Sequence, residues 1–177
     1  MVQAGGAGSG GGVRVEAVAW DDPRASALRE ELGAELDRRY RDLVEGPLPP
    51  TMTVHAESVV WTGLARDGAG IPVGCATLRR LPPLEDVPVD PAVLELKRMF
   101  VAPGHRGTGV AATLLAAAEA AARRVGARRL VLHTGERQPE ALRFYERQGY
   151  GRIPVLAHYA GAPAAVCMAK DLVPRPA

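Results

Sequence analysis

Residues 94–112 read LELKRMFVAPGHRGTGVAA, a strand-like passage that runs through a tight turn into a helix. Leu94 and Leu96 alternate with polar neighbours, so their side chains share one face of the strand. Met99 and Val101 continue the alternation in the opposite phase. A phase shift of one residue indicates a β-bulge between Leu96 and Met99, and such a bulge can part a strand from its neighbour.

The turn itself, RGTGVA at residues 106–111, is rich in glycine and opens the helix. The first N–H groups of a helix have no acceptor within it, and the helix dipole adds positive potential there. Such a helix start can bind a phosphate or a pyrophosphate. Gly107 and Gly109 let the backbone approach the anion closely, and Thr108 or Thr113 can add a hydroxyl donor.

Two other nucleotide-binding turns fit this passage poorly. A P-loop is excluded because no Gly-Lys-Ser/Thr sequence ends the turn. The spacing of Gly107, Gly109 and Ala112 matches a loose dinucleotide fingerprint, which leaves a nicotinamide-dependent oxidoreductase as an alternative. That fingerprint requires an acidic residue at the end of the next strand, whereas this strand ends in His133 and Thr134.

Residues 94–154 resemble the GNAT superfamily of N-acetyltransferases. The signature turn of that family, Arg/Gln-x-x-Gly-x-Gly/Ala, matches Arg106, Gly109 and Ala111 in full. The flanking sequences also match, with ELKRMFV before the turn and QPEALRFYERQGY, residues 138–150, after it. The resemblance implies an acetyl-CoA-dependent N-acetyltransferase that acetylates a primary amine of a small molecule or a protein directly. An acyl-CoA-binding regulatory module with little catalysis is the alternative from another class.

The resemblance also implies where acetyl-CoA binds. The turn amides would bind its pyrophosphate, and its pantetheine arm would lie in the gap between the bulged strand and the next one. There the N–H of Val101 would polarise the thioester carbonyl. Gln138 takes a position that often holds an asparagine in the family. The cofactor-binding residues implied in this way are Met99, Phe100, Val101, Arg106, Gly107, Thr108, Gly109, Val110, Ala111, Gln138 and Tyr145.

Two residues are candidates for moving protons in this reaction. An alkyl ammonium must lose a proton before it attacks, because its pKa is about 10. Glu95 matches the position of the general base in the histone-acetylating branch of the family, with His133 or water as alternatives. Tyr145 matches the usual proton donor to the departing CoA thiolate. Neither Cys75 nor Cys167 matches a nucleophile position in the family, so no acyl-enzyme is expected.

The rest of the chain completes one α/β domain, residues 13–173, after a disordered Gly/Ala-rich tail at residues 1–12. The element order β-α-β-β-β-α-β-α-β-β predicts a mixed sheet of six or seven strands flanked by helices. The GNAT resemblance implies that this sheet is bulged and splayed at its centre. The expected strands are residues 13–19, 59–65, 72–81, 94–101, 130–132, 150–156 and 165–171, and the expected helices are residues 21–41, 110–125 and 139–149.

Composition excludes several classes of protein. The 177 residues carry a formal net charge of only +2, which argues against a nucleic-acid-binding protein. No apolar run is long enough to cross a membrane, residues 1–12 lack the features of a signal peptide, and no metal-ligand spacing is present. Two cysteines fit buried thiols in a reducing cytoplasm. We expect a cytoplasmic monomer or homodimer whose amine acceptor, left open by the sequence, is selected by residues 38–53 and 157–163.

Overall fold

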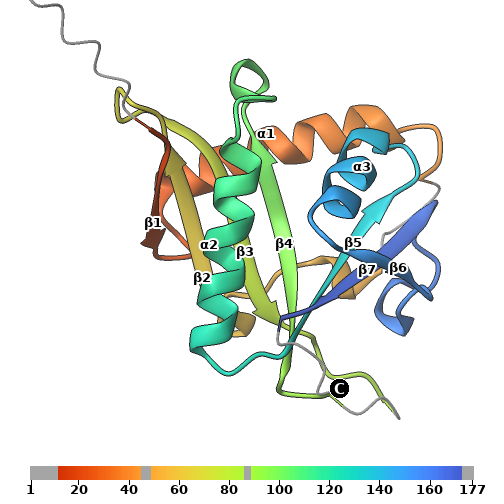
Figure 1. Ribbon diagram of the computed structural model, residues 1–177. Helices are drawn as coiled ribbons and strands as arrows, with labels where there is room; N and C mark the ends of the chain where they lie inside the picture. Colours follow the sequence, from red (N-terminus) through yellow and green to blue (C-terminus); the bar gives the residue numbers. More distant parts are fainter. Residues whose placement is uncertain (1–11, 45–48, 86–88, 173–177) are drawn as a thin grey trace, which may run out of the picture.

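The computed structural model describes residues 12–44, 49–85 and 89–172, so nearly all of the expected N-terminal tail lies outside the described residues. The described strands form one mixed sheet in the order β1-β2-β3-β4-β5-β7-β6, in which β4 and β5 run parallel (Figure 1). This confirms the α/β class and the predicted element order; only β6 is clearly shorter than expected. The strands are β1 (Arg14–Val18), β2 (Val59–Arg66), β3 (Pro72–Arg80), β4 (Val93–Val101), β5 (Arg129–Gly135), β6 (Gly151–Ile153) and β7 (Ala165–Asp171).

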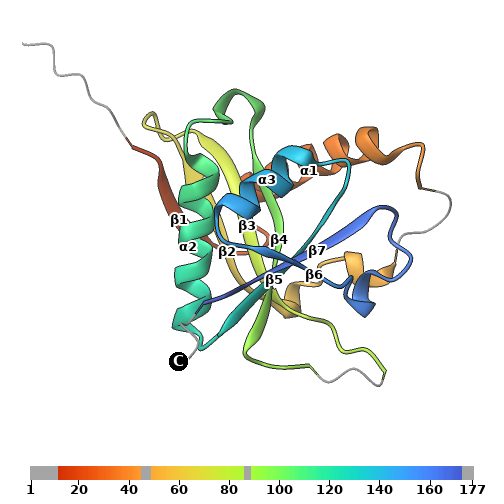
Figure 2. The ribbon, with the colours of Figure 1, turned by 45° about the vertical axis from the view of Figure 1, so that its right-hand side comes forward.

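Helices cover both faces of the sheet (Figures 1 and 2). On the α1 face, Leu28 packs with Phe100 in a compact apolar cluster. On the opposite face, Leu114 of α2 and Tyr145 of α3 belong to the larger core. No helix among the described residues is long and apolar enough to span a bilayer. The helices are α1 (Pro23–Tyr40), α2 (Val110–Arg124) and α3 (Pro139–Arg147), and two short 3₁₀ turns near the site are η1 (Pro50–Met52) and η4 (Ala157–Tyr159).

Asp22 caps the start of α1. The side chain of Asp22 accepts a hydrogen bond from the N–H of Arg24 at 2.9 Å, and Pro23 occupies the first helical position. The helix ends at Tyr40. The Gly- and Pro-rich sequence GPLPP follows at residues 46–50, and its first three residues lie outside the described part of the chain.

The predicted bulge is present in β4. Thr77 of β3 faces Lys97, but Cys75 faces Phe100, so two residues of β4 oppose a single residue of β3. Arg98 lies within this bulge with a φ of 53°, in the left-handed region that few residues with a side chain adopt. The local twist of β4 therefore changes in the middle of the sheet.

The sheet splays beyond the bulge. The parallel pairing of β4 with β5 ends at Leu96 and Leu132. From there β4 remains paired with β3 as far as Val101, whereas β5 remains paired with β7 as far as Gly135 (Figure 2). The two central strands thus part at one end of the sheet, as expected from the phase shift.

Candidate functional site

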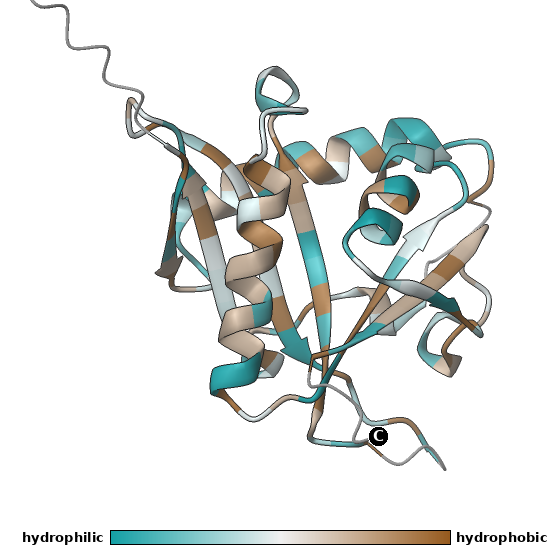
Figure 3. Cartoon of the chain, in the orientation of Figure 1, coloured by the Kyte–Doolittle hydropathy of each residue, from teal (hydrophilic) through white to brown (hydrophobic). Residues whose placement is uncertain are grey.

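The middle of β4 is hydrophilic although β4 lies near the centre of the sheet (Figure 3). Glu95 is fully buried, and its Oε2 accepts a hydrogen bond from Nε of Arg79 at 2.7 Å. Its Oε1 accepts a hydrogen bond from the hydroxyl of Tyr159, which in turn accepts one from Nζ of Lys97 at 3.0 Å. We call these four side chains the Arg79 network. Both carboxylate oxygens of the buried Glu95 therefore have hydrogen-bond partners, as a buried charge requires.

Arg79 also fastens the segments that flank the site. Its guanidinium donates to the backbone carbonyls of Thr51 and Thr53 at 2.6 and 2.7 Å. The hydroxyl of Thr51 donates to the carbonyl of His158 in η4. One buried side chain therefore holds together two segments, around η1 and η4, that the sequence predicts to select the acceptor.

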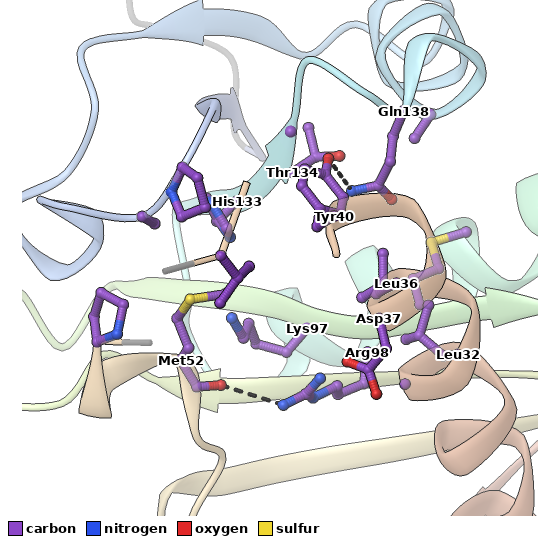
Figure 4. Close-up of a pocket in the computed structure, with 18 of the residues that line it drawn as sticks. Leu32, Leu36, Asp37, Tyr40, Met52, Lys97, Arg98, His133, Thr134 and Gln138 are labelled. Atoms are coloured by element: carbon purple, nitrogen blue, oxygen red, sulfur yellow. Dashed lines mark hydrogen bonds between the residues drawn. The ribbon is translucent and has the colours of Figure 1, made fainter. Parts of the chain in front are cut away.

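A pocket of about 550 Å³ opens next to the Arg79 network (Figure 4). Its walls come from α1 and the segment after it, from the diverging ends of β4 and β5, from α3, and from the segment after η4. The expected acceptor segments both contribute to it, and their role in specificity stays a prediction. Labelled lining residues in Figure 4 are Leu32, Leu36, Asp37, Tyr40, Met52, Lys97, Arg98, His133, Thr134 and Gln138.

The bulge places two consecutive cations against this pocket. Neighbouring residues of a regular strand point to opposite faces, but a bulge breaks this alternation. Lys97 reaches Tyr159, and Arg98 donates to the carbonyl of Met52 at 3.3 Å, so both side chains lie on the α1 face. Burial lowers the pKa of Lys97 to about 8; Arg79 and Arg98 add to the effect, while Glu95 opposes it.

His133 lies across the pocket from β4. Its ring stacks on that of Tyr159 at a centroid distance of 4.0 Å, and its buried Nε2 has no hydrogen-bond partner among the described residues. Burial, with a smaller contribution from Lys97, lowers the pKa of His133 to about 3. The imidazole is therefore neutral at pH 7 and a weak base.

Tyr145 and Gln138 approach the pocket from α3. The Tyr145 hydroxyl lies 3.6 Å from Sδ of Met99, and burial raises the pKa of this phenol above its ordinary value. Nε2 of Gln138 donates to the hydroxyl of Tyr40 at 3.2 Å. The side chains of Tyr145 and Met99 thus meet across the gap left by the splay.

The start of α2 is open to solvent. Gly109 precedes the helix with a φ of 91°, and no side chain in the described part of the chain caps it. A Cβ built on Gly107 or Gly109 would meet no atom within 4 Å. The N–H groups of the first turn of α2 therefore face free space, which is the arrangement that an anion requires.

Arg106 ties this turn to the strand and to α1. Its Nε donates to the carbonyl of Val101 at 2.9 Å, and its guanidinium pairs with Glu35 at 2.6 Å. The N–H of Ala102 donates to Val73 of β3. Because successive peptide groups of a strand alternate in direction, the N–H of Val101 points away from β3, toward the divergence from β5.

The structure separates the predicted site residues. Tyr145, Gln138 and Met99 line the pocket, and Val101 is the last residue of β4, before the glycine turn. The side chain of Phe100 packs in the apolar cluster under α1, and Glu95 belongs to the Arg79 network; neither side chain lines the pocket.

Sequence reasoning missed the roles of Arg79, Lys97 and Arg98, and it placed Tyr159 only within the expected acceptor segment at residues 157–163. Two signals were available in the sequence: a charged residue at the end of an otherwise apolar strand, at Arg79, and adjacent cations at the predicted bulge. Within the described residues, no group of three His, Cys, Asp or Glu side chains could hold a metal ion. Cys75 and Cys167 are both buried and free.

Comparison with known proteins relates this geometry to one family. The model of the acetyltransferase (GNAT) family matches residues 17–150. A curated relative, an IAA acetyltransferase of Azospirillum brasilense, is 36% identical over 78 residues, which cover 44% of this chain and 51% of that protein. The match therefore spans about half the length of this relative.

Solved structures share the fold over nearly the whole chain. A Klebsiella pneumoniae protein described as an acyl-CoA N-acyltransferase is 30% identical, with a TM-score of 0.70 over 91% of this chain and 98% of its own. A PaiA N-acetyltransferase from Thermoplasma acidophilum, solved with coenzyme A, is 13% identical with a TM-score of 0.62 over 90% and 98% of the two chains. The IAA acetyltransferase of Bacillus cereus is 19% identical with a TM-score of 0.59 over 90% and 99%.

Proposed function

Because the chain belongs to the acetyltransferase (GNAT) family, we propose that it transfers the acetyl group of acetyl-CoA directly to a primary amine of a small molecule or a protein. The observation that carries this proposal is the uncapped start of α2, which lies at the end of the cleft where β4 and β5 part. A diphosphate at that helix start and an acyl chain between the strands would bring the thioester to the pocket beside Tyr145. The two buried thiols fit a cytoplasmic protein.

The residues of the turn fit a diphosphate. Gly107 and Gly109 have φ values of 77° and 91°, and the space beside both is free for a ligand. The first amides of α2, at Val110 and Ala111, would donate to the phosphate oxygens. The guanidinium of Arg106 is partly exposed and can add one charged contact without leaving Val101.

Two groups are suited to the chemistry at the thioester. The N–H of Val101, which points toward the splay, would donate to the carbonyl oxygen as negative charge develops on it. Tyr145 would donate a hydrogen bond to the departing thiolate. Its raised pKa keeps the phenol protonated, and a thiol pKa of about 8.5 is too low for the thiolate to remove that proton completely. Tyr145 is thus proposed as a hydrogen-bond donor to sulfur.

The acceptor must lose a proton. Glu95 stays the predicted base, and it would receive this proton through other side chains. Its carboxylate is fully buried, so a proton would reach it through Lys97, which lines the pocket, and the hydroxyl of Tyr159, which contacts both residues. Burial lowers the pKa of His133 to about 3, so this residue is a weak base and the weaker candidate.

Acetyl-CoA binding and turnover are tested separately. Acetyl-CoA is expected to raise the melting temperature, because a ligand that binds only the folded state stabilises it. A CoA-release screen against a panel of primary amines is expected to find turnover. Stabilisation without turnover on any amine would favour the acyl-CoA-binding module. Stabilisation by NAD(P) but not by acetyl-CoA would favour the oxidoreductase and overturn the proposal.

A further inference from the structure

Positive charge outnumbers negative charge on the β4 side of the pocket. Arg79 and Lys97 are buried and Arg98 is half-buried on the α1 face of the sheet, and Glu95 is the buried carboxylate that pairs with the first two. Glu95 is committed to Arg79 at 2.7 Å, whereas Nζ of Lys97 lies 3.9 Å from its nearest oxygen. One carboxylate therefore serves three cations.

The guanidinium of Arg98 makes few hydrogen bonds in this arrangement. Its guanidinium has five N–H donors, and its hydrogen bond to the carbonyl of Met52 is long, at 3.3 Å. Burial lowers the pKa of Arg98, and Arg79 lowers it further. A charge removed from water without a counter-charge destabilises the protein, so a persistent excess of cations calls for an anion from outside.

The charges at the pocket rim do not supply this anion. Asp37 and Arg41, both exposed, line the outer part of the pocket and carry opposite charges. Figure 4 shows Asp37 on α1, on the Arg98 side of the view. Exposed charges are screened by solvent, so their net effect at the buried cations is small.

An amine acceptor alone would worsen the imbalance. An alkyl ammonium that enters the pocket brings a further positive charge beside Lys97 and Arg98, and like charges at short range in a buried site repel. An acceptor that also carries an anion removes the repulsion and satisfies both cations. The left-handed φ of Arg98 is consistent with such a role, since strained backbone of this kind is concentrated at binding sites.

We propose that the acceptor is a small primary amine that also bears an anionic group, a carboxylate or a phosphonate, and that Lys97 and Arg98 bind this group. The proposal rests on the proposed acetyltransferase function and names the substrate class of the same pocket. The anion would sit between the two cations on the bulge, and the amine would point toward the splay, where Tyr145 and Met99 lie. A bound anion would also restore the protonated form of Lys97.

The test uses acceptors in matched pairs with the full-length protein and acetyl-CoA. The panel contains α-, β- and γ-amino acids, the corresponding amides, and aminoalkylphosphonates. The amide of each pair has the less basic amine, so the comparison is biased against the proposal. We expect kcat/KM for the best acid to exceed that for its amide by tenfold or more, and the phosphonate arm decides which anion is preferred.

Two variants assign the effect to the cations. Lys97→Met removes one charge, and Arg98→Asn removes the other while asparagine tolerates the left-handed φ. Each is expected to raise KM for the acid by tenfold or more and to leave KM for the amide within about threefold. Arg152→Gln, which removes an exposed cation paired with Glu136, is the matched control and should change neither value.

The outcomes distinguish a failure of the proposed acceptor class from a failure of the proposed acetyltransferase function. Turnover of the amides at rates equal to or above those of the acids would overturn the inference and leave an acetyltransferase. An equal rise in KM for acids and amides in both variants would also overturn it, because it would show a structural role for the cations. If acetyl-CoA stabilises the protein but no amine is acetylated, the proposed function fails, and the acceptor class falls with it.

Discussion

The guanidinium of Arg79 and the carboxylate of Glu95 form an ion pair at 2.7 Å in which neither side chain exposes more than 1% of its surface. Removal of one partner leaves a buried charge without its counter-ion, which costs about 3 to 5 kcal/mol. We therefore expect Glu95→Leu and Arg79→Met each to lower the free energy of unfolding by about this amount. Urea denaturation of the single variants measures it.

The double variant Arg79→Met/Glu95→Leu separates pairing from packing. Replacement of both partners by apolar residues removes the unpaired charge, so the double variant should recover at least half of the stability lost by either single variant. Losses that simply add would show that the pair is not coupled. Glu95→Gln adds a kinetic readout: lost turnover with unchanged acetyl-CoA affinity in the folded variant would favour the base role of Glu95.

Tyr145→Phe removes the hydroxyl that lies 3.6 Å from Met99 and retains the ring. If the hydroxyl donates to the departing thiolate, turnover should fall about 100-fold, while acetyl-CoA affinity measured by calorimetry is unchanged. Tyr150→Phe is the control, because its hydroxyl contacts Glu119 under α2 and should not affect turnover. Equal turnover in Tyr145→Phe would remove Tyr145 from the chemistry.

Local features of this site were predictable from sequence, and long-range features were not. The bulge at Arg98 is visible as a phase shift within eight residues, and the glycine turn is visible as a motif. The Arg79 network joins residues up to 80 positions apart, because Arg79 contacts Tyr159. Nothing in the local sequence of a loop tyrosine indicates a buried partner on a distant strand, so the contact of Tyr159 with Arg79 could not be predicted from the sequence.

The same distinction applies to Glu95: the sequence predicts the face of β4 on which it lies but not what covers that face. Alternation along β4 correctly puts Glu95 on the face opposite Leu94 and Leu96. Whether that face is open to a substrate depends on what covers it, here η1 and η4 fastened by Arg79. Tertiary contacts of this kind leave no periodic signal in the sequence.

Gly109→Ala tests the anion-binding turn. Gly109 has a φ of 91°, and an alanine in the left-handed region is disfavoured by about 1 to 2 kcal/mol. We expect the turn to shift and acetyl-CoA affinity to fall about tenfold, as measured by isothermal titration. Gly104→Ala is the control in the same loop, since its Cβ would also meet free space and its φ is not positive. Unchanged affinity in Gly109→Ala would mean that the diphosphate binds elsewhere.

His133 predicts how stability depends on acid. Burial lowers its pKa to about 3, from 6.5 in an exposed histidine. Above pH 6.5 the imidazole is neutral in both states and contributes no pH dependence. As the pH falls from 6.5 toward 3, the unfolded chain binds a proton that the folded chain does not, so stability decreases by at most about 1.4 kcal/mol per pH unit.

His133→Gln should remove this loss, because glutamine does not titrate. The quantity to compare is the change in urea midpoint between pH 7 and pH 4, which should be larger for the original protein than for the variant. His55→Gln is the matched control: His55 is exposed, so its removal should leave the change between the two pH values as it was. If His133→Gln and the original protein lose the same stability between pH 7 and pH 4, the imidazole is protonated in the folded state, and the pocket wall beside Lys97 is wetter than its packing against Tyr159 implies.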